Sequence, residues 1–109
     1  MIDPSAAQSA TEPAKDSRSQ SSRRWQVVLL DDDQHTFDYV IEMLARLFGH
    51  PESVAYRFAE EIDRESRAVV WTGYREAAEF KQDQILQYGA DPRIATSTGS
   101  MTAVLEAAV

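Results

Sequence analysis

The first regular pattern along the chain is a short apolar run followed by a helical stripe. Residues 25–30, Trp-Gln-Val-Val-Leu-Leu, are mostly apolar and stop at the polar turn 31–35, which predicts a strand. From 37 to 48, apolar side chains recur at steps of three and four, the spacing of one helix face. Thr36 is a suitable N-cap for this helix, and Gly49 offers a left-handed C-terminal cap. This part of the sequence therefore predicts a strand, a turn and a helix.

The remainder of the chain continues with alternating helical and extended patterns. After the first helix we expect a helix starting at Pro51 and reaching Arg64, and then a strand over 68–71 closed by Thr72 and Gly73. The next expected element is a helix from Arg75 to Tyr88, with the apolar face Ala77, Ala78, Ile85 and Tyr88. A loop over 91–99 and a strand from Met101 to about Ala107 complete the predicted elements. The order β-α-α-β-α-β predicts an α+β fold, a small two-layer α/β sandwich in which three helices cover a three-stranded antiparallel sheet.

The first 24 residues differ in composition from the rest. They are Ser, Ala, Gln, Pro and charged residues with one bulky apolar side chain, Ile2. Such a segment buries too little apolar surface to offset its ordering entropy. We therefore expect a disordered N-terminal tail over 1–24 and one domain over 25–109.

Charge and composition narrow the functional classes. The formal net charge is −7, and seven basic and fifteen acidic side chains fall in 25–109. An acidic domain disfavours nucleic acid as a partner and favours cationic ones. There is no cysteine, no apolar run long enough for a membrane span and no pattern of a secretory signal. We expect a cytoplasmic protein without a membrane partner.

Candidate chemistry is concentrated in the acidic turn after the first strand. Three carboxylates in a row, Asp31, Asp32 and Asp33, repel one another and favour something positive nearby. They could bind a divalent metal with His35, receive an ammonium group, or cap the first helix. The residue pattern alone leaves these alternatives open.

The same stretch resembles the start of a phospho-receiver domain. Val28 to Asp32, followed by the helix from Phe37, copies the apolar strand, acidic pair and amphipathic helix of that family. A receiver domain is built from a fivefold βα repeat, and this chain is too short to contain one. The similarity to a receiver stops at residue 48. A receiver-like phospho-acceptor or a metal-binding domain is thus an alternative without support from the rest of the chain.

A second resemblance runs through the whole ordered region. Residues 26–33, Gln-Val-Val-Leu-Leu-Asp-Asp-Asp, and 37–41, Phe-Asp-Tyr-Val-Ile, are similar to a strand, an Asn-Asp-Asp turn and a helix beginning Met-Glu-Phe-Val. Residues 76–81, Glu-Ala-Ala-Glu-Phe-Lys, are similar to the pattern Glu-Val-Ala-Glu-Thr-Lys. These are the patterns of the ClpS family of Clp protease adaptors, and the similarity covers about 25–108.

The resemblance implies a non-enzymatic adaptor without a cofactor. Such an adaptor is a monomer when free, binds the N-terminal residue of substrate proteins and delivers them to a Clp AAA+ unfoldase of the ClpA or ClpC type. The implied sites are Asp31, Asp32 and Asp63 for the α-amino group; Leu29, Phe37, Val40, Ala59 and Ile62 for the hydrophobic pocket; and Glu76 and Lys81 for the unfoldase interface.

The implied mouth of the pocket departs from the family pattern. Asp31 stands where the family has Asn, and Asp63 stands where it has a His that helps to hold the α-amino group. Phe37 and Ala59 both stand where the family often has Met. His35 could lend a hydrogen-bond donor to the mouth. The domain therefore either binds N-terminal residues with an altered preference, including longer or basic ones, or modulates the unfoldase without binding them.

Overall fold

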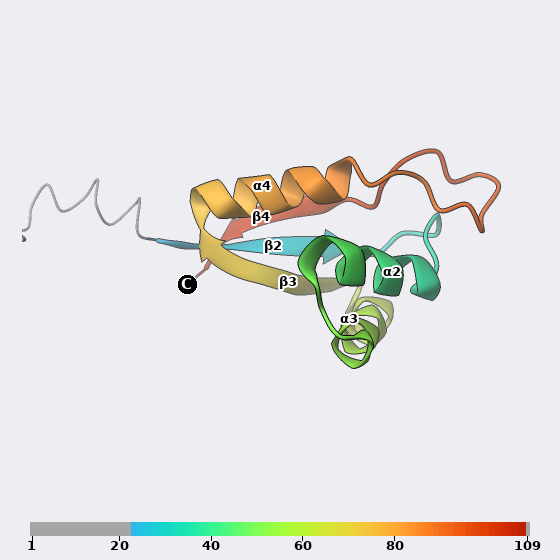
Figure 1. Ribbon diagram of the computed structural model, residues 1–109, viewed down its shortest axis with the longest axis horizontal. Coiled ribbons are helices and arrows are strands. Elements are labelled where there is room, and N and C mark those ends of the chain that lie inside the picture. The colour runs from blue at the N-terminus through green and yellow to red at the C-terminus, as the bar shows by residue number, and fades with distance from the viewer. Residues whose placement is uncertain (1–22, 109) are drawn as a thin grey trace, which may run out of the picture.

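The computed structural model describes residues 23–108, which form one layer of strands and three helices (Figure 1). The elements are β2 (Arg24–Leu30), α2 (Phe37–Phe48), α3 (Glu52–Glu65), β3 (Arg67–Tyr74), α4 (Arg75–Leu86) and β4 (Ala103–Ala107). The sheet has the order β3-β2-β4, and both pairings are antiparallel. The predicted α+β fold and element order are confirmed. The prediction for the tail lies outside the described residues, apart from Arg23 and from Arg24, which begins β2.

The strand β3 is longer than the sequence pattern predicts. Its pairing with β2 continues past Trp71 to Tyr74, so Thr72 and Gly73 extend the strand instead of closing it. Gly73 serves packing here and not a turn: a Cβ built on it would lie 2.2 Å from the Trp71 ring, so the absent side chain makes room for the indole. The register also shifts between Val27 and Val28, where β3 contains an irregularity.

The helices begin and end close to their predicted positions. The Thr36 side chain accepts a hydrogen bond from the Tyr39 N–H, and Gly49 has the left-handed φ of 71° that a helix C-cap requires. The helix α4 ends at Leu86, two residues earlier than expected. In its predicted apolar face Ala78 is buried but Ala77 is exposed, because α4 packs on the sheet along a narrower stripe.

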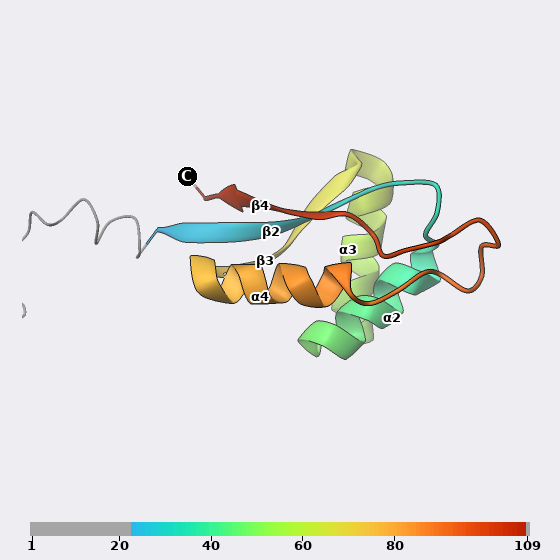
Figure 2. The same ribbon diagram turned by 90° about the horizontal axis from the view of Figure 1, so that it is seen from above.

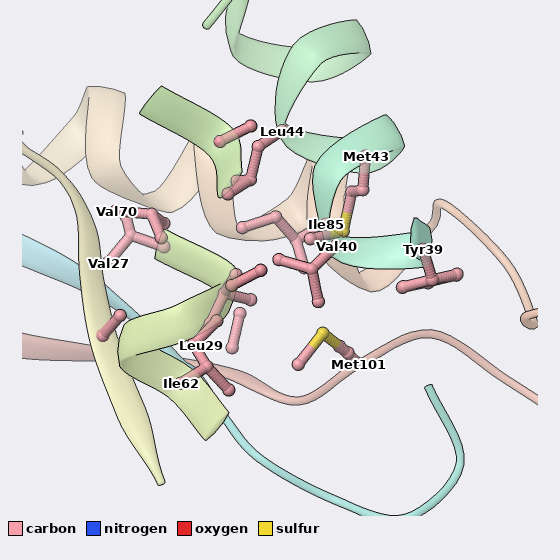
Figure 3. Close-up of a cluster of buried hydrophobic side chains, with 14 of the residues drawn as sticks. Val27, Leu29, Tyr39, Val40, Met43, Leu44, Ile62, Val70, Ile85 and Met101 are labelled. Atoms are coloured by element: carbon pink, nitrogen blue, oxygen red, sulfur yellow. The ribbon is translucent and has the colours of Figure 1, made fainter. Parts of the chain in front are cut away.

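One apolar core lies between the sheet and the helices. Figure 2 shows α4 and α2 on the same side of the sheet, and α3 packs against α2 and β3. Figure 3 shows side chains from the strands, the helices and the loop before β4 meeting in this core. Among residues 23–108, no helix is long and apolar enough to cross a membrane.

Candidate functional site

The acidic turn lies where β2 ends, next to the C-terminal end of α3. The Asp31 N–H donates to the Ser66 carbonyl at 2.9 Å, which ties the turn to the residue that caps α3. Asp63 lies on α3 three residues before Ser66, and both Asp31 and Asp63 are exposed. The fold therefore brings the backbones of these two predicted amino-group ligands to one end of the molecule.

Asp32 points into the turn and is already hydrogen-bonded there. Its Oδ1 accepts from the Gln34 N–H at 2.8 Å and lies 2.8 Å from the His35 Nδ1, with Oδ2 at 3.0 Å from the same nitrogen. The Asp32 side chain is 29% exposed. Of the three carboxylates that follow β2, Asp32 is thus the one held by both a backbone N–H and the His35 ring.

His35 is deeply buried, which the sequence pattern gave no reason to expect. Its side chain is 4% exposed, and its ring lies 4.5 Å from the Tyr39 ring, centroid to centroid. The Nε2 lies 2.7 Å from the carbonyl oxygen of Gly99, 64 residues further along the chain. His35 therefore joins the acidic turn to the loop that precedes β4.

That loop, residues 87–102, is anchored by a carboxylate that sequence reasoning missed. Asp91 is 1% exposed and accepts four hydrogen bonds, from the Thr36 N–H at 2.7 Å, the Thr36 hydroxyl at 2.8 Å, the Arg93 N–H at 2.9 Å and the Arg93 Nη1 at 3.2 Å. Burial by itself raises the pKa of Asp91, but these hydrogen bonds outweigh it and lower the pKa to about 2.

Further contacts fasten the same loop to the acidic turn. The Leu30 N–H donates to the Thr102 carbonyl at 3.1 Å, and the Thr96 hydroxyl donates to the Gln34 Oε1 at 2.9 Å. Figures 1 and 2 show the loop before β4 and the turn after β2 at the same end of the molecule. The only signal in the sequence is a loop rich in Ser and Thr with one Asp, residue types that hydrogen-bond to nearby backbone.

Four of the five predicted pocket residues come together in the core. Leu29, Val40, Ala59 and Ile62 belong to one buried cluster and are at most 4% exposed. Figure 3 shows Leu29 from β2, Val40 from α2 and Ile62 from α3 in this cluster. These three elements are those that flank the acidic turn.

The fifth pocket residue, Phe37, lies outside the core. It is 37% exposed, and its ring packs edge-on against Tyr56 with the centroids 5.4 Å apart. Tyr56 also borders an open depression of about 730 Å³ on α3, together with Glu52, Ser53 and Arg57. Phe37 is thus the most exposed of the five predicted pocket residues, and its contact with Tyr56 was not predicted.

The two predicted unfoldase-facing residues lie on α4 and differ in their surroundings. Glu76 is in the first turn of α4 and is exposed. Lys81 is half-buried, with its Nζ 5.0 Å from the centroid of the Phe48 ring at the end of α2. The Lys81 ammonium group therefore forms a cation–π interaction with the Phe48 ring.

The metal-binding and receiver alternatives find no support in the geometry of residues 23–108. Within residues 23–108, no group of three or more His, Asp or Glu side chains is placed to hold a metal ion. The sheet is antiparallel and three-stranded, which excludes the repeated βα architecture of a receiver.

Together these features define a small α+β domain in which a polar turn follows a strand that contributes to the apolar core. Residues 20–93 match the model of the family described as ATP-dependent Clp protease adaptor protein ClpS. The chain is 35% identical over 69 residues to the adapter ClpS of Hydrogenovibrio crunogenus, covering 63% of this chain and 66% of that one. It is 32% identical over 66 residues to the adapter ClpS of a Nostoc species, covering 60% and 68%.

The fold has a counterpart among solved structures. ClpS2 of Agrobacterium tumefaciens, bound to L-phenylalaninamide, superposes with a TM-score of 0.69 at 23% identity and covers 80% of this chain and 99% of that one. This chain belongs to the ClpS family of Clp protease adaptors. It spans about two thirds of the length of the two curated relatives above.

Proposed function

We propose that this chain binds substrate proteins through their N-terminal residue and delivers them to a Clp AAA+ unfoldase-protease, without catalysing a reaction itself. One observation carries the proposal: the acidic turn follows directly on β2, whose Leu29 side chain lies in the same apolar cluster as Val40 and Ile62. The N-terminal residue of a protein carries a cationic α-ammonium group next to its side chain. A carboxylate complements the ammonium group, and an apolar surface beside it complements a large apolar side chain.

The amino-group site would be formed by Asp31, Asp32 and Asp63. Support comes from the hydrogen bond between Asp31 and Ser66, which holds the turn and the end of α3 together. An ammonium group in this position forms charge-assisted hydrogen bonds, which are stronger than neutral ones. The phenylalaninamide in the Agrobacterium relative has an α-amino group and an aromatic side chain, which fits the same kind of site.

The pocket would differ from the usual family pattern in its charge and in its rim. The mouth would carry three carboxylates, Asp31, Asp32 and Asp63, where the family usually has one, and this charge favours a cation. At the rim, the rings of Phe37 and Tyr56 add an exposed aromatic surface. We therefore expect a preference that includes basic N-terminal residues, because their second positive charge also meets an acidic mouth. The apolar wall continues to favour large apolar residues.

The unfoldase would bind to the surface of α4 that includes Glu76 and Lys81. We expect a partner of the ClpA or ClpC type, a cytoplasmic location and a monomeric adaptor in the free state. Exposure of Glu76 supports the placement, since a charged side chain free of intramolecular packing is available to a partner.

A peptide panel tests the substrate side of the proposal. Fluorescent peptides that differ only in the first residue, Phe, Leu, Trp, Tyr, Arg, Lys or Gly, are titrated against the full chain. We expect binding to at least one large apolar or basic N-terminus and none to Gly. Failure of all seven peptides to bind would refute recognition of N-terminal residues.

A pull-down with a ClpA-type or ClpC-type unfoldase tests the adaptor side. The variant Glu76→Ala with Lys81→Ala is expected to lose most of the captured unfoldase, whereas Glu60→Ala, an exposed change on α3, is not. Equal capture by all three chains would remove the proposed interface from α4.

A second candidate is a modulator that binds the unfoldase but no N-terminal residue. The observation in its favour is that the Asp32 carboxylate is already bonded to Gln34 and His35. Unfoldase capture without any binding in the peptide panel would establish this alternative.

A further inference from the structure

His35 makes two polar contacts that are both directed at oxygen atoms. Its Nδ1 lies 2.8 Å from Asp32 Oδ1 and its Nε2 lies 2.7 Å from the Gly99 carbonyl oxygen. A carbonyl oxygen accepts hydrogen bonds only, and so does an ionised carboxylate. Each ring nitrogen of His35 therefore faces an oxygen that accepts hydrogen bonds.

The ring is enclosed by groups that restrict it to this orientation. Tyr39 packs against it from α2, and its hydroxyl donates to the Gly89 carbonyl at 2.6 Å. The neighbouring Thr36 is held by Asp91, whose charge is balanced by Arg93. Asp32 is thus the carboxylate in direct contact with His35.

His35 cannot contact a substrate directly, because its side chain is 4% exposed and both nitrogens are engaged. Asp32 can, because it is 29% exposed and a carboxylate accepts about four hydrogen bonds. The described contacts place Gln34 and His35 on Oδ1 and only the longer His35 contact on Oδ2. Oxygen Oδ2 therefore retains capacity for an ammonium group.

We propose that His35 is a positioning residue that fixes the Asp32 carboxylate for an incoming α-ammonium group and ties it to the Gly99 segment. The inference rests on the proposed recognition of N-terminal residues. A carboxylate held in one orientation does not lose rotamer entropy on binding, so a pre-organised Asp32 binds a cation more tightly than a freely rotating one. The match to the ClpS family ends at residue 93, before Gly99. The contact between His35 and Gly99 therefore involves a segment outside the matched region.

Two isosteric substitutions separate the two contacts of His35. In His35→Asn the amide nitrogen occupies the place of Nδ1 and keeps the donor to Asp32 but loses the contact to Gly99. In His35→Gln the amide nitrogen occupies the place of Nε2 and keeps the contact to Gly99 but loses the donor to Asp32. Both variants remove the ring, so the difference in affinity between them reports which contact matters.

The test is a titration with the best free-amino peptide of the panel, with each fold verified by circular dichroism. We expect His35→Gln to bind about tenfold more weakly than His35→Asn, since a hydrogen bond to a charged group is worth roughly 1.4 kcal/mol or more. Thr96→Ala, which cuts a different contact between the turn and the loop, is expected to change the affinity less than about twofold.

A double-mutant cycle distinguishes positioning from general support of the loop. In an Asp32→Asn background the difference between the Gln and Asn variants is expected to disappear, because the group being positioned is gone. Equal affinities of His35→Gln and His35→Asn, or a weaker Asn variant, would overturn the inference while leaving the proposed function intact. If the wild-type chain binds no free-amino peptide, the proposed function fails and this inference fails with it.

Discussion

The apolar wall and the polar mouth of the candidate site are organised by different kinds of contact. Leu29, Val40 and Ile62 are buried against one another by elements whose hydrophobic periodicity is local in sequence. The mouth depends on pairs far apart in the chain, such as Thr36 with Asp91 and His35 with Gly99. Burial of the wall stabilises the fold, whereas the contacts of the mouth set the orientation of a few polar groups.

This difference implies that the two regions can be altered separately. Changes to the wall are expected to lower the free energy of unfolding, and changes to the mouth are expected to act mainly on binding. Asp91 is the exception, because it is a polar group that is as buried as the core.

The largest effect is expected in the wall. Leu29→Ala removes a fully buried side chain and is expected to lower the free energy of unfolding by about 3 kcal/mol in a urea titration. The control is Leu86→Ala, at a side chain that is 47% exposed, with an expected loss below about 1 kcal/mol. A loss at Leu29 as small as that at Leu86 would show that the wall is not part of the core.

The next effect concerns Asp91 and depends on pH. Its pKa of about 2 in the folded chain is lower than the ordinary value of 3.8, so it stabilises the fold above about pH 4, and this contribution disappears as the pH falls toward 2. Asp91→Asn is expected to cost about 2 kcal/mol at pH 7 and progressively less below pH 4. Asp33→Asn, in the exposed turn, serves as the control. A penalty for Asp91→Asn that is constant from pH 7 to pH 2.5 would contradict this linkage.

The fold and the wall were largely predictable from sequence, and the mouth was not. Stripes at helical spacing and apolar runs between turns located the helices and strands of residues 23–108, because each pattern reflects burial of one face. The predicted end of β3 was wrong, because a glycine in a sequence usually indicates a turn. In the structure the Trp71 ring fills the space that a side chain at position 73 would need. The roles of His35 and Asp91 follow from chain pairings across about 55 to 64 residues, which no local pattern contains.

A third effect compares two carboxylates of the acidic turn. Asp32→Asn removes the oriented charge and is expected to weaken binding of a free-amino peptide about tenfold. Asp33→Asn changes the same net charge at an exposed position and is expected to weaken it less than about twofold. Equal losses would mean that only the overall charge of the mouth matters, and the orientation of Asp32 does not.

The smallest effect separates the two residues of the proposed unfoldase interface. Lys81→Met removes the cation above the Phe48 ring and is expected to cost about 0.5 kcal/mol of stability. Glu76→Ala is expected to leave the unfolding midpoint unchanged because Glu76 is exposed. If both changes leave stability unchanged, Lys81 is as free for a partner as Glu76.

Recognition of a substrate's free α-amino group is the most direct test of the proposed function. A peptide with a preferred N-terminal residue is titrated against the full chain in two forms, with a free and with an acetylated N-terminus. The acidic mouth predicts that the free form binds at least about tenfold more tightly, because acetylation removes the charge that the carboxylates recognise. Equal affinity of the two forms would show that this end of the molecule does not recognise the N-terminus of a substrate.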